Sequence, residues 1–268
     1  MSILDAILLG VVQGATEFLP VSSSGHLIIA RNLFGITTEG GLAFDASLHL
    51  ATLAAIVVYF YPDLKKLALT TYAWLRRQKT DPSSLLLVKA ILIGSIPAVI
   101  AGFLFGGIIE VVFRSPFSVA GGLLIGSVIM LFAEYSKHEH EKPEAVSLPH
   151  ALIIGFFQAL ALIPGMSRSG MTISGGMLLG LTREEAARFA FLLAVPVVLG
   201  AGGMKFLGLI TDGGGAVTIL PLLLGCVVAF ASGLAAVWGL MKLVRTTSLL
   251  PFVIYRIVLG AALLLFFI

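Results

Sequence analysis

Long apolar stretches with few charges run through most of this chain, and they limit the folds open to it. A helix of about 20 residues crosses the hydrocarbon core of a bilayer. With 58% hydrophobic and 12% charged residues, the composition lies outside the range of soluble domains. Nothing alternates like a barrel strand, so we predict an all-α polytopic membrane protein. Six stretches are long enough to be transmembrane helices: 43–62, 85–107, 116–135, 184–208, 217–241 and 250–268.

Two further apolar stretches, 3–34 and 148–180, are interrupted in the middle by proline, glycine and serine. Neither half of either stretch can cross a bilayer alone, so each stretch is expected to form a re-entrant helical hairpin that enters and leaves on one side. Backbone at such a break is tolerated at membrane depth only where protein buries it or where it lines a wet cavity. We therefore expect both hairpin tips in the interior.

The two interrupted stretches are related to each other. Laid over one another without a gap at an offset of 145, residues 6–37 and 151–182 match at ten of 32 positions, including Ser-x-Ser-Gly. This similarity predicts two repeats, 1–135 and 148–268, joined by a cytoplasmic loop at 136–147 within one integral membrane domain. Each repeat would hold one hairpin and three spans. Because three is odd, the repeats would have inverted topology, with a site where the broken helices meet.

Positive charges predict the orientation of the chain. Lysine and arginine gather in the connections 63–84, 136–147 and 242–249, whereas the connections near 108–115 and 209–216 hold only Arg114. By the positive-inside rule the first group is cytoplasmic. Both termini and the mouth of the first hairpin are then outside. The net charge of +3 reports this orientation and does not indicate nucleic-acid binding.

The first hairpin carries groups that can do acid–base or nucleophilic chemistry. Gln13 and Glu17 are four residues apart, so they share one face of the helix that leads into the break. Pro20 ends that helix. A new half-helix is expected after it, and its free N–H groups favour an anion. The break and the first turn after it add three hydroxyls and an imidazole, from Ser22, Ser23, Ser24 and His26.

The second hairpin supplies a positive charge, because Arg168 lies between two short apolar half-helices. A buried arginine needs an anion, and its planar fork suits phosphate oxygens. Together the two tips indicate phosphate-ester or anhydride chemistry on an amphiphile. Two alternatives stay open: a purely structural Arg168–Glu17 ion pair and a non-catalytic scaffold. Further hydroxyl donors beside the arginine are Ser167, Ser169 and Thr172.

Three polar residues elsewhere in the apolar segments receive structural interpretations. Asp45 opens the first span and is expected to interact with the helix dipole, with His49 as a supporting group near the site. Arg256 lies near the end of the last span, where a long side chain can reach the membrane interface.

The runs Gln13-Gly14-Ala15-Thr16-Glu17-Phe18-Leu19-Pro20-Val21-Ser22-Ser23-Ser24-Gly25-His26 and Pro164-Gly165-Met166-Ser167-Arg168-Ser169-Gly170-Met171-Thr172 closely resemble two motifs of a known family. It is the family of undecaprenyl-diphosphate phosphatases linked to bacitracin resistance. The resemblance implies hydrolysis of the lipid carrier diphosphate at the outer face of the bacterial inner membrane, which recycles the carrier for peptidoglycan synthesis. It also implies a divalent cation, Mg²⁺ or Ca²⁺.

Position by position, the resemblance implies that Glu17 is the essential acid with Gln13 as its partner, and these two are the candidate metal ligands. It implies that His26 and Ser23 act in the chemical step. We expect His26 as nucleophile or general acid/base, with Ser23 as the competing nucleophile and direct water attack as the third option.

Expected partners are the polyprenyl diphosphate and membrane lipids, with a homodimer left open. The alternative function is a polyprenyl-phosphate flippase. Phosphate binding is assigned to Arg168, supported by Ser167, Ser169, Thr172 and Ser22.

Overall fold

The computed structural model describes residues 1–36, 41–113, 115–136, 146–211 and 218–267. In these ranges the regular structure is entirely helical, which confirms the predicted all-α class. The helices are α1 (Ile3–Phe18), α2 (Ser23–Phe34), α3 (Gly41–Tyr59), α4 (Tyr61–Leu75), α5 (Pro82–Val112), α6 (Pro116–Tyr135), α7 (Leu148–Leu160), α8 (Arg168–Leu178), α9 (Arg183–Thr211), α10 (Ile219–Leu243) and α11 (Leu250–Phe267).

Several of these helices fit a multi-pass membrane protein. Within the described residues, α5, α6, α9 and α10 are long and apolar enough to cross a bilayer, and α3 with α4 adds a fifth candidate if the bent pair is one span. The expected span at 250–268 corresponds to α11, a shorter apolar helix. Most of the predicted loop 136–147 lies outside the described residues.

The segment after residue 59 differs from the prediction. The expected span 43–62 ends at Tyr59, and the chain bends by 88° into α4 instead of entering a plain connection over 63–84. Pro62 lies in the first turn of α4, where its missing N–H costs nothing, whereas a continued α3 would have lost a hydrogen bond there. The proline therefore starts a new helix at this point.

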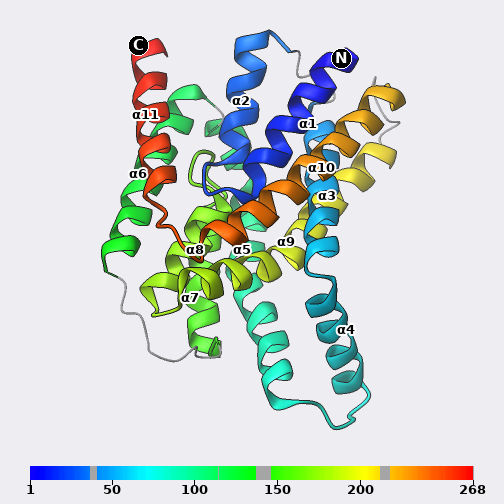
Figure 1. Ribbon diagram of the computed structural model, residues 1–268. Helices are drawn as coiled ribbons and strands as arrows, with labels where there is room; N and C mark the ends of the chain where they lie inside the picture. Colours follow the sequence, from blue (N-terminus) through cyan, green and yellow to red (C-terminus); the bar gives the residue numbers. More distant parts are fainter. Residues whose placement is uncertain (37–40, 114, 137–145, 212–217, 268) are drawn as a thin grey trace.

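The two interrupted stretches form the two helical hairpins that place the site. In Figure 1, α1 descends from the end of the molecule that carries both termini and α2 returns toward it, while α7 starts from the opposite end. α1 packs mainly on α10, and α7 packs mainly on α5. The loops at the two breaks, 19–22 and 161–167, therefore meet inside the molecule.

Glycines let each hairpin approach its neighbouring long helix closely. A Cβ at Gly10 of α1 would collide with the Gly225 carbonyl of α10. A Cβ at Gly155 of α7 would collide in the same way with the Gly94 carbonyl of α5. Gly10 and Gly155 match at the offset of 145, so matched positions make matched helix contacts. Small residues serve this purpose in membranes because they let backbones come together.

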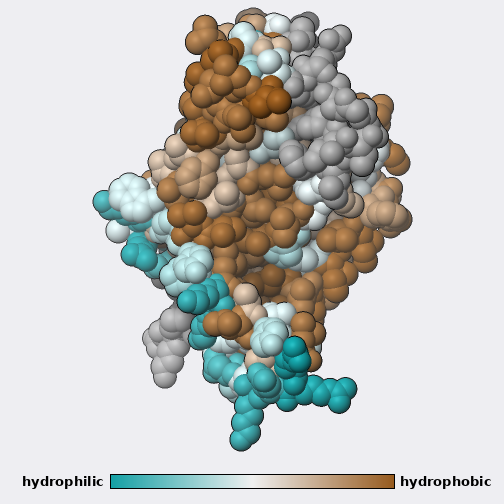
Figure 2. Space-filling view, turned by 90° about the vertical axis from the view of Figure 1, so that its right-hand side faces the viewer, coloured by the Kyte–Doolittle hydropathy of each residue, from teal (hydrophilic) through white to brown (hydrophobic). Residues whose placement is uncertain are grey.

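The charged end of the molecule lies where α4 connects to α5. Figure 2 shows apolar side chains over most of one face and hydrophilic ones gathered at its lower end. In this connection, Asp81 caps α5 and accepts hydrogen bonds from the hydroxyls of Ser83 and Ser84, each at 2.6 Å. Those bonds hold the pKa of Asp81 below its ordinary value.

Candidate active site

The two hairpin tips have the same local structure. Ser22 and Ser167 cap α2 and α8 and hold φ angles of 75° and 73°, a region that non-glycine residues rarely occupy. Each serine hydroxyl accepts a hydrogen bond from a backbone N–H in the helix it caps, at Gly25 in one case and Gly170 in the other. Such a backbone persists only where its surroundings fix it, which is typical of functional sites.

Hydrogen bonds join one tip to the other. The Gly165 N–H donates to Ser22 Oγ at 3.1 Å, and Ser169 Oγ donates to the Leu19 carbonyl at 3.1 Å. Gly165 itself has a φ of 94°. The first turns of α2 and α8 thus begin beside one another, and exposed N–H groups at helix starts attract anions.

Glu17 lies at the centre of this arrangement, in the last turn of α1 and 7% exposed. Its Oε1 accepts from Arg168 Nη2 at 2.5 Å, across the two hairpins. Its Oε2 accepts from Gln13 Nε2 at 2.8 Å and from Ser23 Oγ at 2.6 Å. The structure therefore brings together four of the residues that the sequence singled out, and it contains the Arg168–Glu17 ion pair that was one of the open alternatives.

His49 of α3 reaches the same carboxylate. Its Nε2 lies 3.5 Å from Glu17 Oε2, and its Nδ1 must donate to the Asp45 carbonyl at 2.8 Å, because a carbonyl only accepts. Asp45 lies beyond the first turn of α3, so the expected interaction with the helix dipole is wrong, and the carboxylate instead pairs with the buried Arg31 at 2.6 Å. His49 Nε2 therefore borders one side of the Glu17 carboxylate, near the site as expected.

His26 contacts Ser22 and Tyr255. Its Nδ1 donates to the Ser22 carbonyl at 2.7 Å, so in the neutral ring Nε2 accepts from the Tyr255 hydroxyl at 2.6 Å. The two rings also stack, with centroids 5.7 Å apart. Both ring nitrogens are therefore engaged with groups of the chain itself.

Arg256 was misjudged from the sequence. Instead of reaching the membrane interface it is fully buried, with 0% exposure. Its guanidinium donates to the tip carbonyls of Pro20, Gly165 and Met166 at 3.0–3.1 Å, and to Ser127 Oγ at 3.2 Å. Its place in an apolar helix gave no signal of this role, because its partners lie 90 or more residues away in sequence.

The remaining predicted hydroxyls are held by their own hairpin. Ser167 Oγ lies 3.2 Å from Ser169 Oγ, and Thr172 Oγ1 donates to the Arg168 carbonyl at 2.7 Å. These contacts stabilise the second tip next to Arg168.

A family model described as the bacitracin resistance protein BacA matches residues 6–262. This chain belongs to the BacA family. It is 43% identical over 267 residues to an undecaprenyl-diphosphatase of Geotalea daltonii, with 99% of this chain and 98% of the relative covered. It is 40% identical over 268 residues to an undecaprenyl-diphosphatase of Alteromonas mediterranea, with 99% of both chains covered. A third, from Trichlorobacter lovleyi, is 44% identical over 265 residues, with 97% and 95% covered.

The BacA-family site offers a small set of oxygen donors for a divalent cation. Among the described residues, no three His, Cys, Asp or Glu side chains lie together as a protein-only metal site. Gln13 Oε1 is buried without a hydrogen-bond partner among the described residues, while Nε2 of the same amide contacts Glu17. Mg²⁺ is commonly bound by one or two carboxylates together with substrate phosphates. The donors present fit a cation of that kind.

Proposed function

We infer that this chain hydrolyses undecaprenyl diphosphate to undecaprenyl phosphate and inorganic phosphate. The observation that carries the inference is the contact of Glu17 with both Ser23 and Arg168, at 2.6 and 2.5 Å. In this contact a hydroxyl, a proton acceptor and a guanidinium that can bind phosphate meet at one buried carboxylate. The relatives named undecaprenyl-diphosphatase over nearly their whole length supply the substrate. The names of these relatives give no support to the flippase alternative.

Ser23 is the nucleophile that this geometry favours, because its proton acceptor is already in contact. Ser23 Oγ attacks the terminal phosphorus as Glu17 takes the hydroxyl proton, and the bond from that phosphorus to the bridging oxygen breaks to release undecaprenyl phosphate. Water then attacks the same phosphorus and the bond to Ser23 Oγ breaks. Ser23 takes back the proton from Glu17, and both water protons leave with the phosphate.

Positive groups around Glu17 neutralise the diphosphate. A guanidinium has five N–H donors, and the contact with Glu17 uses one nitrogen of Arg168, which leaves others for phosphate oxygens. The starts of α2 and α8 add backbone N–H groups. Glu17 and Gln13 would hold the Mg²⁺ or Ca²⁺, which when bound supplies further charge neutralisation.

We also propose that the two repeats have inverted topology and that the first hairpin opens to the outer side of the membrane. The matched contacts of Gly10 and Gly155, and the matched caps at Ser22 and Ser167, support two repeats that pack alike. The basic residues of α4 and of its connection to α5 favour a cytoplasmic location for that end, which supports a first hairpin that opens to the periplasmic side of the inner membrane. Hydrolysis there returns the lipid carrier to peptidoglycan synthesis.

Phosphate release by the purified protein in detergent tests the function, since detergent leaves no second membrane face for transport. We expect release with undecaprenyl diphosphate, loss of release with Arg168→Ala, and wild-type release with Arg188→Ala, a control arginine that is 53% exposed and paired with Asp63. A chelator should lower release and added Mg²⁺ should restore it. If folded Arg168→Ala releases phosphate at the wild-type rate, the proposed site is wrong.

Rapid quenching identifies the nucleophile. Acid-stable phosphate on Ser23 would support the mechanism above, and acid-labile phosphate on His26 would replace it with histidine catalysis. Absence of any labelled protein would favour direct attack by water.

A further inference from the structure

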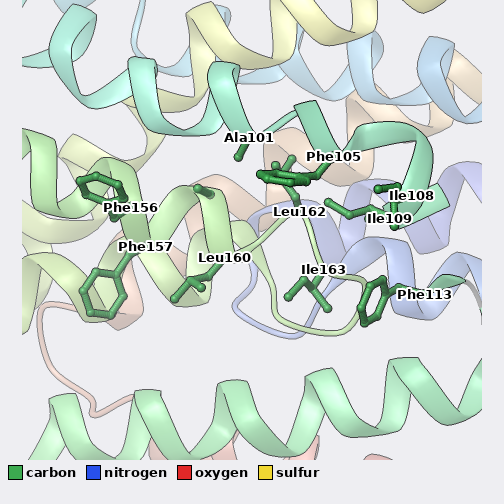
Figure 3. Close-up of a pocket in the computed structure, with 11 residues that line it drawn as sticks. Ala101, Phe105, Ile108, Ile109, Phe113, Phe156, Phe157, Leu160, Leu162 and Ile163 are labelled. Carbon is green, nitrogen blue, oxygen red and sulfur yellow. The ribbon is translucent and has the colours of Figure 1, made fainter. Parts of the chain in front are cut away.

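An apolar cavity of about 490 Å³ lies beside the second hairpin tip. It is bounded by the second half of α5, by α7 and by the tip residues Leu162 and Ile163. Figure 3 shows Phe105 and Ile109 of α5 pointing at the tip side chain of Leu162, with Phe156 and Leu160 of α7 alongside. All of the described side chains that line it are hydrocarbon, so this part of the lining offers nothing to a polar ligand.

The cavity opens toward the surface that contacts lipid. Phe105 and Phe156 are 52% and 59% exposed although they form its walls. Glycines leave the α5 backbone bare beside it: a Cβ at Gly106 would meet nothing within 4 Å in the described structure, and one at Gly102 would just reach Leu162. A flexible hydrocarbon chain can therefore enter sideways from the bilayer.

The cavity borders the hairpin tip that carries Arg168. Ile163 in its wall is five residues from Arg168, so the two positions are at most about 18 Å apart even along a fully extended chain. A volume of about 490 Å³ is within the usual range for small ligands, which suits part of a long chain. A diphosphate at Arg168 would have the first part of its lipid tail within reach of this cavity.

We propose that the cavity between α5, α7 and the second tip binds the first isoprene units of the polyprenyl tail. This proposal rests on the proposed function and adds to it where the tail leaves the site. The occupant is the tail of the substrate rather than the acyl chain of a bulk phospholipid, because the cavity adjoins the tip that carries the phosphate-binding Arg168. The rest of the tail continues into the surrounding lipid.

Photo-cross-linking tests the proposal without relying on turnover. The probe is undecaprenyl phosphate with a diazirine on its first isoprene unit, added to the full-length protein in phosphatidylglycerol nanodiscs. We expect label on peptides that contain Phe105, Phe156 or Leu160, reduced by unlabelled undecaprenyl phosphate and unaffected by additional phosphatidylglycerol. Label on α9, α10 or the α6–α11 face overturns the proposal. Equal competition by phosphatidylglycerol also overturns it, since the cavity would then be a bulk-lipid site.

Matched variants on α5 add a kinetic test. Ala101→Trp fills the cavity, while Phe103→Ala changes a side chain two residues from Phe105 that is 89% exposed and outside the cavity. We expect Ala101→Trp to raise KM for undecaprenyl diphosphate about tenfold. A change of this size in binding follows when two methylene groups of the tail lose their contacts with the cavity. Phe103→Ala should leave KM unchanged. An unchanged KM in folded Ala101→Trp overturns the proposal. If the wild type releases no phosphate, the proposed function is refuted, and the labelling result alone decides whether the tail binds in this cavity.

Discussion

Replacement of Arg256 by methionine tests whether this buried side chain holds the two tips in their catalytic arrangement. Methionine keeps an unbranched apolar stem and removes every donor. The carbonyls of Pro20, Gly165 and Met166 then lose their contacts with the guanidinium. A buried acceptor left without its partner costs about 1–3 kcal/mol. We take the low end of that range, because removing a buried charge is itself favourable and offsets part of the cost. The three unpaired carbonyls together then cost about 3 kcal/mol.

A loss of about 3 kcal/mol at the tips corresponds to roughly a hundredfold in rate. We therefore expect Arg256→Met to lower kcat for phosphate release about a hundredfold at saturating substrate. Arg256→Lys keeps the charge with only three donors and should fall between the variant and the wild type. Arg245→Met is the matched control, because Arg245 is 60% exposed and pairs with Glu184 near the end of α10.

The assay is phosphate release in detergent, together with size-exclusion chromatography and thermal unfolding to establish that each variant is folded. A folded Arg256→Met protein with kcat within about threefold of the wild type would refute the reasoning. So would equal losses in the Arg256 and Arg245 variants, since the effect would then be unrelated to the tips.

Three further predictions follow from the site and the charged end. Glu17→Gln and Ser23→Ala should each lower kcat by about 10²–10⁴-fold, and wild-type phosphate release by either variant would exclude the proposed proton transfer. Tyr255→Phe removes one hydrogen bond to His26 and should reduce kcat less than tenfold; a rise would indicate that His26 is the nucleophile. Because the pKa of Asp81 is lowered, its stabilising effect is present above the ordinary carboxylate range and is lost as pH falls through the folded pKa. Asp81→Asn should therefore lower the unfolding temperature at neutral pH, with a difference that disappears in acid, and a constant difference would contradict this.

Local patterns in the sequence were sufficient to predict much of the site. Gln13 and Glu17 are four residues apart on a helix, and they form the expected contact at 2.8 Å. The breaks with proline, glycine and serine identified both tips, and the cost of a buried arginine indicated that Arg168 needs an anion, for which the Glu17 pair was one of the alternatives. These inferences held because short-range helix geometry and the cost of buried charge act in any fold.

Other features depend on contacts between distant segments. The hydroxyl that engages His26 belongs to Tyr255, 229 residues later, so the direction of the imidazole could not be derived from its neighbours. The burial of Arg256 could not be derived from its neighbours either, because its hydrogen-bond partners are also distant in the sequence. The 88° bend after Tyr59 was missed because hydropathy measures how apolar a stretch is and carries little information about its direction.

The dependence of both tips on Arg256 has a consequence for the order in which the protein is made. The first hairpin, α1 and α2, is synthesised before any of its partners at Gly165 and Arg256 exist. Its Ser22 backbone, with a φ of 75°, and the Pro20 carbonyl must wait for α8 and then for α11 to insert. We therefore expect the tips to reach their final arrangement only after the last helix has entered the membrane, and a nascent chain stalled before α11 to release phosphate more slowly than the complete protein.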